Sequence, residues 1–310
     1  MSLIKKSTEL SLPTTVKMMI YGQAGTGKST LALSAPQPLL LDFDGGVSRV
    51  NTTHLDGVGI VQVTCWNDAL SVLKEDLSAF RTVVVDTAGK MMDFIINHRC
   101  GTRQPSIRDW SGINAEFNNF TRALASLGKN VIYIAHRDVM RDGDDTVYIP
   151  MLRAKNFSVI VTELDLLGYM ETKLENGRLT RTITFDPTNR SEGKNACNLP
   201  GIMDIPQIFD TSGNATAKND FIQTKVLAPY FSMLAMKKEQ QQKYTEVVKE
   251  ITDAVELITD PTSAKSFADS IDDFKHVGTS KAVARQLFAK KLAALNIKYN
   301  KSTKEYEQQA

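Results

Sequence analysis

The chain has 310 residues and a formal net charge of +2, and 42% of its residues are hydrophobic and 23% charged. A chain of this length can bury one large core, or one core with a smaller satellite. The small net charge gives no argument for nucleic-acid or membrane binding by itself, because a basic patch can lie within a nearly neutral total. No apolar run reaches the roughly 18–20 residues that a membrane-spanning helix needs, so no membrane partner is expected.

The cysteines and the N-terminal sequence indicate the compartment. Cys65, Cys100 and Cys197 are far apart and lack the spacing of a zinc site or of a disulfide framework, which suits a reducing cytoplasm. The N-terminal residues contain no apolar stretch long enough for a signal peptide. A cytoplasmic protein is therefore expected.

Over the first two-thirds of the chain, short β-branched runs alternate with helical segments, which predicts a parallel sheet with crossover helices. Strands are expected at residues 16–21, 39–43, 60–63, 82–86 and 131–135, and helices at 28–34, 68–80, 90–97 and 114–127. The strands are continuous apolar runs, as is typical of strands that are covered on both faces.

The pattern changes in the last third. Residues 166–171 and 179–185 flank the Asn176-Gly177 pair, which predicts a hairpin turn and an antiparallel edge on the sheet. From about residue 236 the apolar residues recur at helical spacing, which predicts three helices. We therefore expect an ATPase core over residues 1–235, a small helical unit over 236–300, and a disordered polar tail over 301–310.

A phosphate-binding loop is the strongest motif in the sequence. Residues 22–29 fit the pattern G-x-x-x-x-G-K-[ST] in full, with a predicted strand before and a predicted helix after. Lys28 should reach the β- and γ-phosphates and Ser29 should ligate Mg²⁺, while the backbone and the helix N-terminus cradle the phosphates. A glycine-rich turn without a ligand is the alternative. The nucleotide is expected to contact Gly22, Gln23, Ala24, Gly25, Thr26, Gly27, Lys28, Ser29 and Thr30.

Acidic residues end two of the predicted strands. Asp86 follows a buried run and is expected to hold Mg²⁺ opposite Ser29; a capping aspartate is the alternative. Asp42 and Asp44 end an earlier strand, and the carboxyl ends of parallel strands open onto the ligand crevice. One of these two should orient or activate the attacking water. We favour Asp44, which lies beyond the strand end, against the alternative of an aspartate that caps a turn before two glycines.

A histidine ends the strand that follows. His136 comes directly after the apolar residues 131–135 and can contact the γ-phosphate there. The alternative is a histidine that is hydrogen-bonded at a strand end without a ligand. The candidate catalytic residues are therefore Lys28, Asp44, Asp86 and His136.

These motifs resemble the RecA-like P-loop ATPases, and more narrowly the phage nucleotide-binding proteins grouped with RecA/RadA recombinases and single-strand annealing proteins. The resemblance covers about residues 14–205 and rests on the phosphate-binding loop, the strand that ends at Asp42, the strand that ends at Asp86, and Ala135-His136. It implies an α/β RecA-like fold with a mostly parallel sheet, that Asp44 positions the hydrolytic water, and that His136 senses the γ-phosphate. It also implies a phage origin, and with it the host cytoplasm.

The same resemblance implies mobile DNA-contacting loops at about residues 137–157. The basic candidates are Arg137, Arg141, Arg153 and Lys155, and the aromatic ones are Trp110 and Phe157; a solvated charged loop is the alternative, because nearby aspartates would repel phosphates. Relatives often donate a Lys-x-Arg pair to the neighbouring subunit. This sequence lacks it, and Arg190 or Lys194 would have to substitute.

The leading hypothesis is an ATPase with Mg²⁺ that acts on single-stranded DNA in recombination or annealing, as a ring or filament of identical subunits whose hydrolysis is stimulated by DNA. Replication proteins such as a single-strand binding protein are possible partners, and the C-terminal helices either recruit them, support oligomerisation or only pack. The alternatives are a replication helicase or helicase loader, a small-molecule P-loop kinase, and a scaffold that binds ATP and barely hydrolyses it. The absence of a guanine-binding signature favours ATP.

Overall fold

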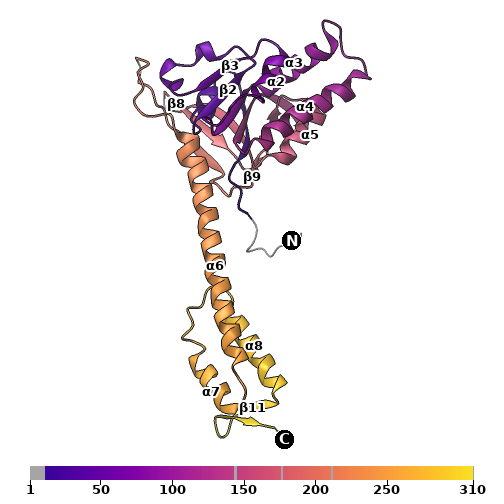
Figure 1. Ribbon diagram of the computed structural model, residues 1–310. Helices are drawn as coiled ribbons and strands as arrows, with labels where there is room; N and C mark the ends of the chain where they lie inside the picture. The colour runs from indigo at the N-terminus through magenta and orange to yellow at the C-terminus, as the bar shows by residue number, and fades with distance from the viewer. Residues whose placement is uncertain (1–10, 143–144, 176, 211, 310) are drawn as a thin grey trace. The chain divides into compact units, whose positions relative to one another are not determined.

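The computed structural model describes residues 11–142, 145–175, 177–210 and 212–309 (Figure 1). The chain divides into two compact units, one over Pro13–Phe231 and one from Ser232 onward, and each is described by itself. The helix α6 (Ala228–Glu256) begins in the first unit and continues into the second.

The first unit is built on one mixed sheet in the order β10-β8-β7-β1-β5-β4-β2-β3. The six strands from β7 to β3 along this order are parallel, and β8 and β10 add an antiparallel edge. The strands are β1 (Lys17–Gly22), β2 (Pro38–Asp42), β3 (Gly59–Gln62), β4 (Thr82–Asp86), β5 (Asn130–Asp142), β6 (Asp145–Pro150), β7 (Leu166–Glu175), β8 (Arg178–Thr184), β9 (Lys194–Asn195) and β10 (Ile202–Ile205). This is the α/β architecture expected from the sequence, a mostly parallel sheet with flanking helices and an antiparallel edge.

Helices cover both faces of the sheet. The helices are α1 (Lys28–Ala32), α2 (Trp66–Val72), α3 (Ala88–Cys100), α4 (Asp109–Ser126) and α5 (Ala154–Glu163). The side chains of Met19, Leu41 and Val85 pack with residues of α2 to α5 in one continuous core, and Figure 1 shows these helices on one side of the sheet. Successive residues of a strand point to opposite faces, so Met18 and Ile20 are buried on the other face, as continuous apolar strands require.

Two expectations about local structure were wrong. The helix expected at residues 68–80 ends at Val72, and Asp76 accepts a hydrogen bond from the Ser78 backbone, a local turn that competes with helix. Residues 137–157, expected as mobile loops, continue β5, pair back as β6 and enter α5, because each residue of β5 beyond His136 finds a ladder partner in β6. The Asn176-Gly177 turn falls partly outside the described residues, although β7 and β8 pair as expected.

The second unit has a core of its own. Val247, Ile251 and Val255 on α6 pack with residues from α7 (Pro261–Ser270) and α8 (Ser280–Ala294). Asp260 caps α7 and accepts a hydrogen bond from the Ser263 backbone. The tail expected to be disordered contains a strand: β11 (Ile297–Asn300) and β12 (Glu305–Gln308) form an antiparallel hairpin, in which Tyr299 pairs with Tyr306. Aromatic cross-strand pairs stabilise such a hairpin although its composition is polar.

None of the helices in the described part of the chain is both long enough and apolar enough to span a membrane.

Candidate functional site

The phosphate-binding loop connects β1 to α1. Gly22 ends β1, and a Cβ at this position would collide with the backbone carbonyl oxygen of Met170 on the adjacent β7. Gly27 has φ of 94° and precedes α1 directly, a left-handed conformation that only glycine adopts without strain. Two of the glycines of the motif are therefore required by the backbone, one for close strand approach and one for the turn into the helix.

Lys28 is a buried cation that forms no ion pair with a carboxylate of the described residues. Its side chain is 6% exposed and Nζ donates a hydrogen bond to the Gln23 carbonyl oxygen over 2.7 Å. Burial lowers the pKa of the Lys28 ammonium, and the charges of Asp86 and Asp44 oppose this shift. A phosphate that displaces the Gln23 carbonyl would supply the negative charge that the ammonium lacks.

Asp86 meets Ser29 at the carboxyl end of β4. The Ser29 hydroxyl donates to Oδ2 of Asp86 over 2.5 Å, and Asp86 is 6% exposed. Burial raises the pKa of the Asp86 carboxyl, as do the charges of Asp42 and Asp44, whereas the Ser29 hydrogen bond and Lys28 lower it. Carboxylates crowded in this way are a destabilised arrangement that a bound cation would relieve.

The Ser29 and Asp86 oxygens fit a magnesium ion. They are a hydroxyl and a carboxylate, the oxygen ligands that Mg²⁺ prefers, and they already lie within contact distance of each other. In P-loop enzymes, Mg²⁺ keeps several waters and takes its remaining ligands from the substrate phosphates. These two residues would therefore hold the ion together with a triphosphate. The sequence predicts this from the phosphate-binding loop and from the acid that ends the strand at residues 82–86.

The two acids that follow β2 have different environments. Asp42 is 2% exposed, and its two carboxylate oxygens accept hydrogen bonds from the backbone N–H groups of Gly46 at 3.0 Å and Val47 at 3.1 Å. The Asp44 side chain is 28% exposed, with Arg49 at 3.7 Å as an ion-pair partner. Asp42 therefore shapes the loop, and Asp44 is free to face a ligand.

Backbone hydrogen bonds hold Asp44 beside the end of β4. The Asp86 carbonyl oxygen accepts from the Phe43 N–H at 2.8 Å and from the Asp44 N–H at 3.2 Å. Asp44 thereby contributes to the electrostatic environment of Lys28, Asp86 and His136. The structure brings together the four candidate catalytic residues around one site.

His136 lies between the phosphate-binding loop and the strand of Asp86. β5 separates β1 from β4, and His136 pairs with Gly22 in the parallel register. Burial lowers the pKa of the His136 imidazole, and the positive charges of Lys28 and Lys90 lower it further, against the effect of Asp44. The imidazole is therefore neutral at pH 7 and can donate or accept a hydrogen bond beside the phosphates.

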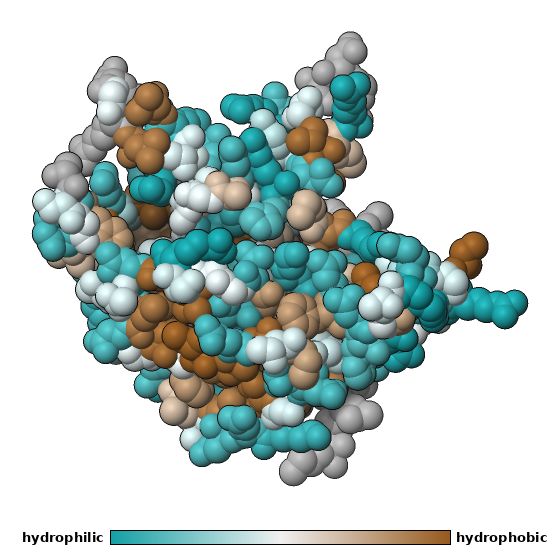
Figure 2. Space-filling view, turned by 90° about the horizontal axis from the view of Figure 1, so that it is seen from above, coloured by the Kyte–Doolittle hydropathy of each residue, from teal (hydrophilic) through white to brown (hydrophobic). Residues whose placement is uncertain are grey.

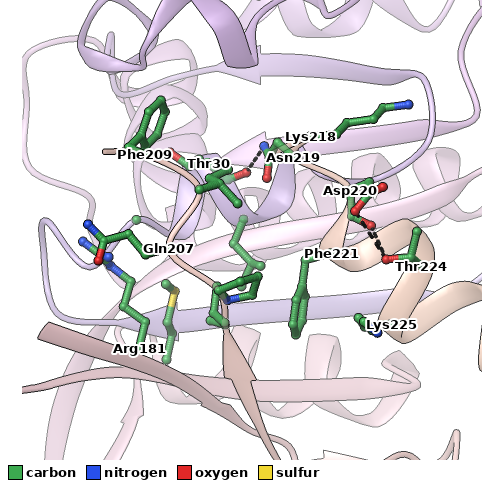
Figure 3. Close-up of a pocket in the computed structure, with 16 residues that line it drawn as sticks. Thr30, Arg181, Gln207, Phe209, Lys218, Asn219, Asp220, Phe221, Thr224 and Lys225 are labelled. Carbon is green, nitrogen blue, oxygen red and sulfur yellow. Dashed lines mark hydrogen bonds between the residues drawn. The ribbon is translucent and has the colours of Figure 1, made fainter. Parts of the chain in front are cut away.

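A cavity of about 330 Å³ opens beside the phosphate-binding loop, and sequence reasoning missed it. Its lining includes Gly27 and Thr30 on one side and residues 205–209 and 218–221 on the other. Figure 3 shows Thr30 above the cavity, with Arg181 and Gln207 at one end and Asp220 and Thr224 at the other. Its volume and its aromatic residues, Phe209 and Phe221, suit a nucleoside.

The segment that forms this cavity is attached to the loop by hydrogen bonds. Asn219 Nδ2 donates to the Thr30 carbonyl oxygen at 2.8 Å, and Arg181 Nε on β8 donates to the Thr26 carbonyl oxygen at 3.2 Å. These contacts join residues far apart in the sequence. In the sequence, the arginines of β8 are the feature that could have indicated a contact with the phosphate-binding loop. The prediction of an edge hairpin did not use them.

The basic residues proposed for DNA contact lie in three settings. The Arg137 guanidinium donates to the Tyr169 hydroxyl at 3.0 Å and lies 4.4 Å from the Tyr148 ring centroid. Arg141 is exposed on the β5–β6 hairpin. Arg153 stacks 3.6 Å from the centroid of the Trp110 ring. The side chains of Lys155 and Phe157 lie outside the described residues.

The two residues considered for action on a neighbouring subunit also differ. Lys194 Nζ donates to the carbonyl oxygens of Val161 at 2.9 Å and Thr162 at 3.0 Å, at the C-terminal end of α5. Arg190 is exposed on the loop after β8. Lys194 is therefore used within its own chain, and Arg190 has the exposure that a contact with another subunit requires.

Comparison with known proteins gives one family. A profile of the AAA domain family matches residues 14–197, the part of the chain that holds every candidate catalytic residue. No curated protein matches the chain. Among solved structures, a KaiC-like protein from Pyrococcus horikoshii OT3 is similar, with 13% identity, a TM-score of 0.36, and coverage of 62% of this chain and 89% of that chain. The flagellar accessory protein FlaH from Methanocaldococcus jannaschii gives 14% identity, a TM-score of 0.36, and coverage of 64% and 93%.

Proposed function

The chain belongs to the AAA domain family and carries a P-loop ATPase domain, and from this premise we propose that it hydrolyses ATP with Mg²⁺ and acts on single-stranded DNA in recombination or annealing as an oligomer. The observation that carries the ATPase part is the meeting of Ser29 with Asp86 beside the buried Lys28. A kinase would need a substrate group at Asp44 and an arginine-rich lid over the phosphates, and the segment with Arg137 and Arg141, which could have supplied such a lid, forms a strand hairpin.

The residues of the site divide the work of hydrolysis. Lys28 leaves the Gln23 carbonyl and neutralises the β- and γ-phosphates. Ser29 and Asp86 would hold Mg²⁺, and the ion would offset the charge that develops on the phosphate oxygens. Asp44 accepts a proton from water as the water oxygen bonds to the γ-phosphorus and the bond to the bridging oxygen breaks. ADP and phosphate are the products. The nucleoside occupies the cavity lined by Thr30 and Phe221.

The path of β5 supports the proposed action on DNA. One continuous strand passes from the core of the sheet through His136 and then forms the β5–β6 hairpin, which carries Arg137 and Arg141. A change at the γ-phosphate that moves His136 is therefore transmitted directly to a hairpin that carries Arg137 and Arg141. Cationic side chains near aromatic rings, such as Arg153 on Trp110, are typical of surfaces that bind single strands.

Exposed apolar side chains support the proposed oligomer. Leu174 and Leu179 face each other across the β7–β8 hairpin, and their exposed fractions are 73% and 45%. Ile202 on the edge strand β10 is 63% exposed. The face seen in Figure 2 is mostly hydrophilic but includes an apolar region. Exposed apolar groups and an unpaired strand edge are features that subunit contacts cover.

Phosphate release measured with and without single-stranded DNA tests the proposal, with particle size measured in the same solutions. We expect Mg²⁺-dependent turnover that single-stranded DNA stimulates and nucleosides do not, and particles larger than one chain. Stimulation by a nucleoside acceptor, with transfer of the phosphate to it, would instead identify a kinase. Unwinding of a forked duplex would identify a helicase.

A further inference from the structure

A second cavity, of about 370 Å³, lies beside His136 and outside the phosphate-binding loop. It is formed by the end of β4, the first turn of α3, the start of the β5–β6 hairpin and the first turns of α5. His136 lines this cavity, and the charges of Lys28 and Asp44 act on the same imidazole from the nucleotide site. The cavity therefore shares a wall with the site of hydrolysis.

The inner wall of the cavity contains an acceptor without a donor. Asn156 on α5 is 1% exposed and lines the cavity. Its Oδ1 has no hydrogen-bond partner among the described residues, and its Nδ2 faces only the Met92 sulfur, at 3.8 Å. Buried side-chain carbonyl oxygens are nearly always paired, and an unpaired one is costly. A ligand with an N–H group would satisfy it.

The lining of the cavity is mixed in charge and partly apolar: it contains the cations Lys90 and Arg153 and the carboxylates Asp93 and Asp138. The Lys90 side chain is 51% exposed, with Asp93 at 3.6 Å, and Arg153 is held over the Trp110 ring. The first turn of α3, a helix of 13 residues, adds the positive end of its dipole. Met151, which also lines the cavity, is 47% exposed. These groups suit a ligand that offers an N–H donor to Asn156 and an anionic group to Lys90 and Arg153.

We propose that this cavity receives one nucleotide of an unpaired DNA strand, with the exocyclic amino group of its base donating to Asn156 Oδ1 and its phosphate near Lys90 and Arg153. The inference rests on the proposed function and adds to it a preference for bases that carry an amino group. An amino base is retained because it pairs the buried acceptor, whereas a base without an N–H donor at that place leaves it unpaired. Since His136 lines both sites, the strand and the triphosphate act on the same side chain.

Binding of two oligonucleotides that differ at one ring position tests this. Oligodeoxycytidine carries a 4-amino group, and the corresponding oligonucleotide of 2-pyrimidinone deoxynucleotides carries hydrogen at that position and keeps N3 as an acceptor. With Mg²⁺ and a non-hydrolysable ATP analogue, fluorescence anisotropy should give about fivefold or greater preference of the wild-type chain for oligodeoxycytidine, as expected for one net hydrogen bond. In Asn156→Leu the preference should fall below about twofold, with the affinity for the 2-pyrimidinone oligonucleotide unchanged.

Two further variants separate the contact with the base from the contact with the phosphate. Asn118 also has a buried, unpaired Oδ1 among the described residues but does not line the cavity, so Asn118→Leu is the matched control and should keep the preference. Lys90→Ala should weaken both oligonucleotides equally, because a phosphate contact does not depend on the base. Thermal unfolding of each variant checks the fold.

Each outcome decides one claim. Strand binding without a base preference in the wild-type chain, or a preference that survives Asn156→Leu, overturns the assigned cavity and leaves the proposed function standing. No strand binding at all overturns the proposed function and the inference with it. Asn156-dependent binding of deoxycytidine monophosphate without strand binding identifies a free nucleotide as the ligand and overturns the strand. If Asn156→Leu does not fold, the ratio of the two oligonucleotide affinities in the wild-type chain still decides whether the cavity prefers an amino base.

Discussion

Asp42 and Asp44 are two residues apart, and the structure assigns them opposite roles that mutation can separate. In Asp42→Asn, one of the two oxygens that accept from Gly46 and Val47 becomes an N–H donor that faces a backbone donor. Hydrogen bonds to a charged group contribute about 1.5–3 kcal/mol each. Relief of the repulsion with Asp86 offsets part of the loss. We expect a net loss of about 2–4 kcal/mol, or roughly 5–15 °C in Tm for a unit of this size.

Asp44→Asn should keep the stability of the fold and lose turnover. Its exposed ion pair with Arg49 contributes at most about 1 kcal/mol, so Tm should change by less than about 4 °C. Loss of the proton acceptor should lower kcat by about 10²-fold or more, while the affinity for Mg·ATP is retained. Circular dichroism on heating, phosphate release and titration with a fluorescent ATP analogue measure the three quantities. A stable but inactive Asp42→Asn together with a near-normal rate for Asp44→Asn would refute the assignment.

The other predictions concern the phosphate, metal and subunit contacts. Lys28→Ala should fold and lose turnover, and the rise in Tm that Mg·ATP gives the wild-type chain, about 2.7 kcal/mol at 100 times Kd or roughly 5–10 °C, should largely disappear. Asp86→Asn should also be inactive, but its apo form should unfold at a higher temperature than wild type at pH 7–8. Because the pKa of Asp86 is raised in the folded state, the wild-type chain loses stability as the pH rises above the ordinary carboxyl value of 3.8. The difference in Tm between Asp86→Asn and wild type should therefore vanish at pH 3. Equal Tm values at pH 7 would contradict this prediction. Lys194→Ala should lower Tm, by about 1–3 kcal/mol in stability, because two carbonyls lose their donor, whereas Arg190→Ala should keep Tm and lower turnover only in the oligomer; the reverse pattern in these two variants would exchange their roles.

The parts of the site that sequence predicts are those that local patterns determine. The phosphate-binding loop is contiguous, and Asp86, Asp44 and His136 all follow apolar strands. Because the carboxyl ends of parallel strands open on one edge, strand assignment alone places these side chains together. The register of β5 between β1 and β4 bears this out for His136.

The features that could not be predicted from the sequence depend on contacts between segments that are far apart in the chain. The nucleoside cavity needs residues 205–225 to fold against Thr30, and Arg181 to reach the Thr26 carbonyl from β8. The unpaired Oδ1 of Asn156 is a property of packing that no spacing reports. The strand at residues 305–308 has a polar composition, which does not reveal that Tyr306 pairs with Tyr299 on the neighbouring strand.

A structure of the chain with Mg²⁺ and a non-hydrolysable ATP analogue tests the central claim most directly. We expect Lys28 Nζ to leave the Gln23 carbonyl for the β- and γ-phosphates, Ser29 Oγ to exchange its hydrogen bond with Asp86 for a magnesium ion, and the base to lie in the cavity beside Phe221. A structure at saturating nucleotide in which Lys28 still contacts Gln23 and the phosphates lie elsewhere would contradict the account.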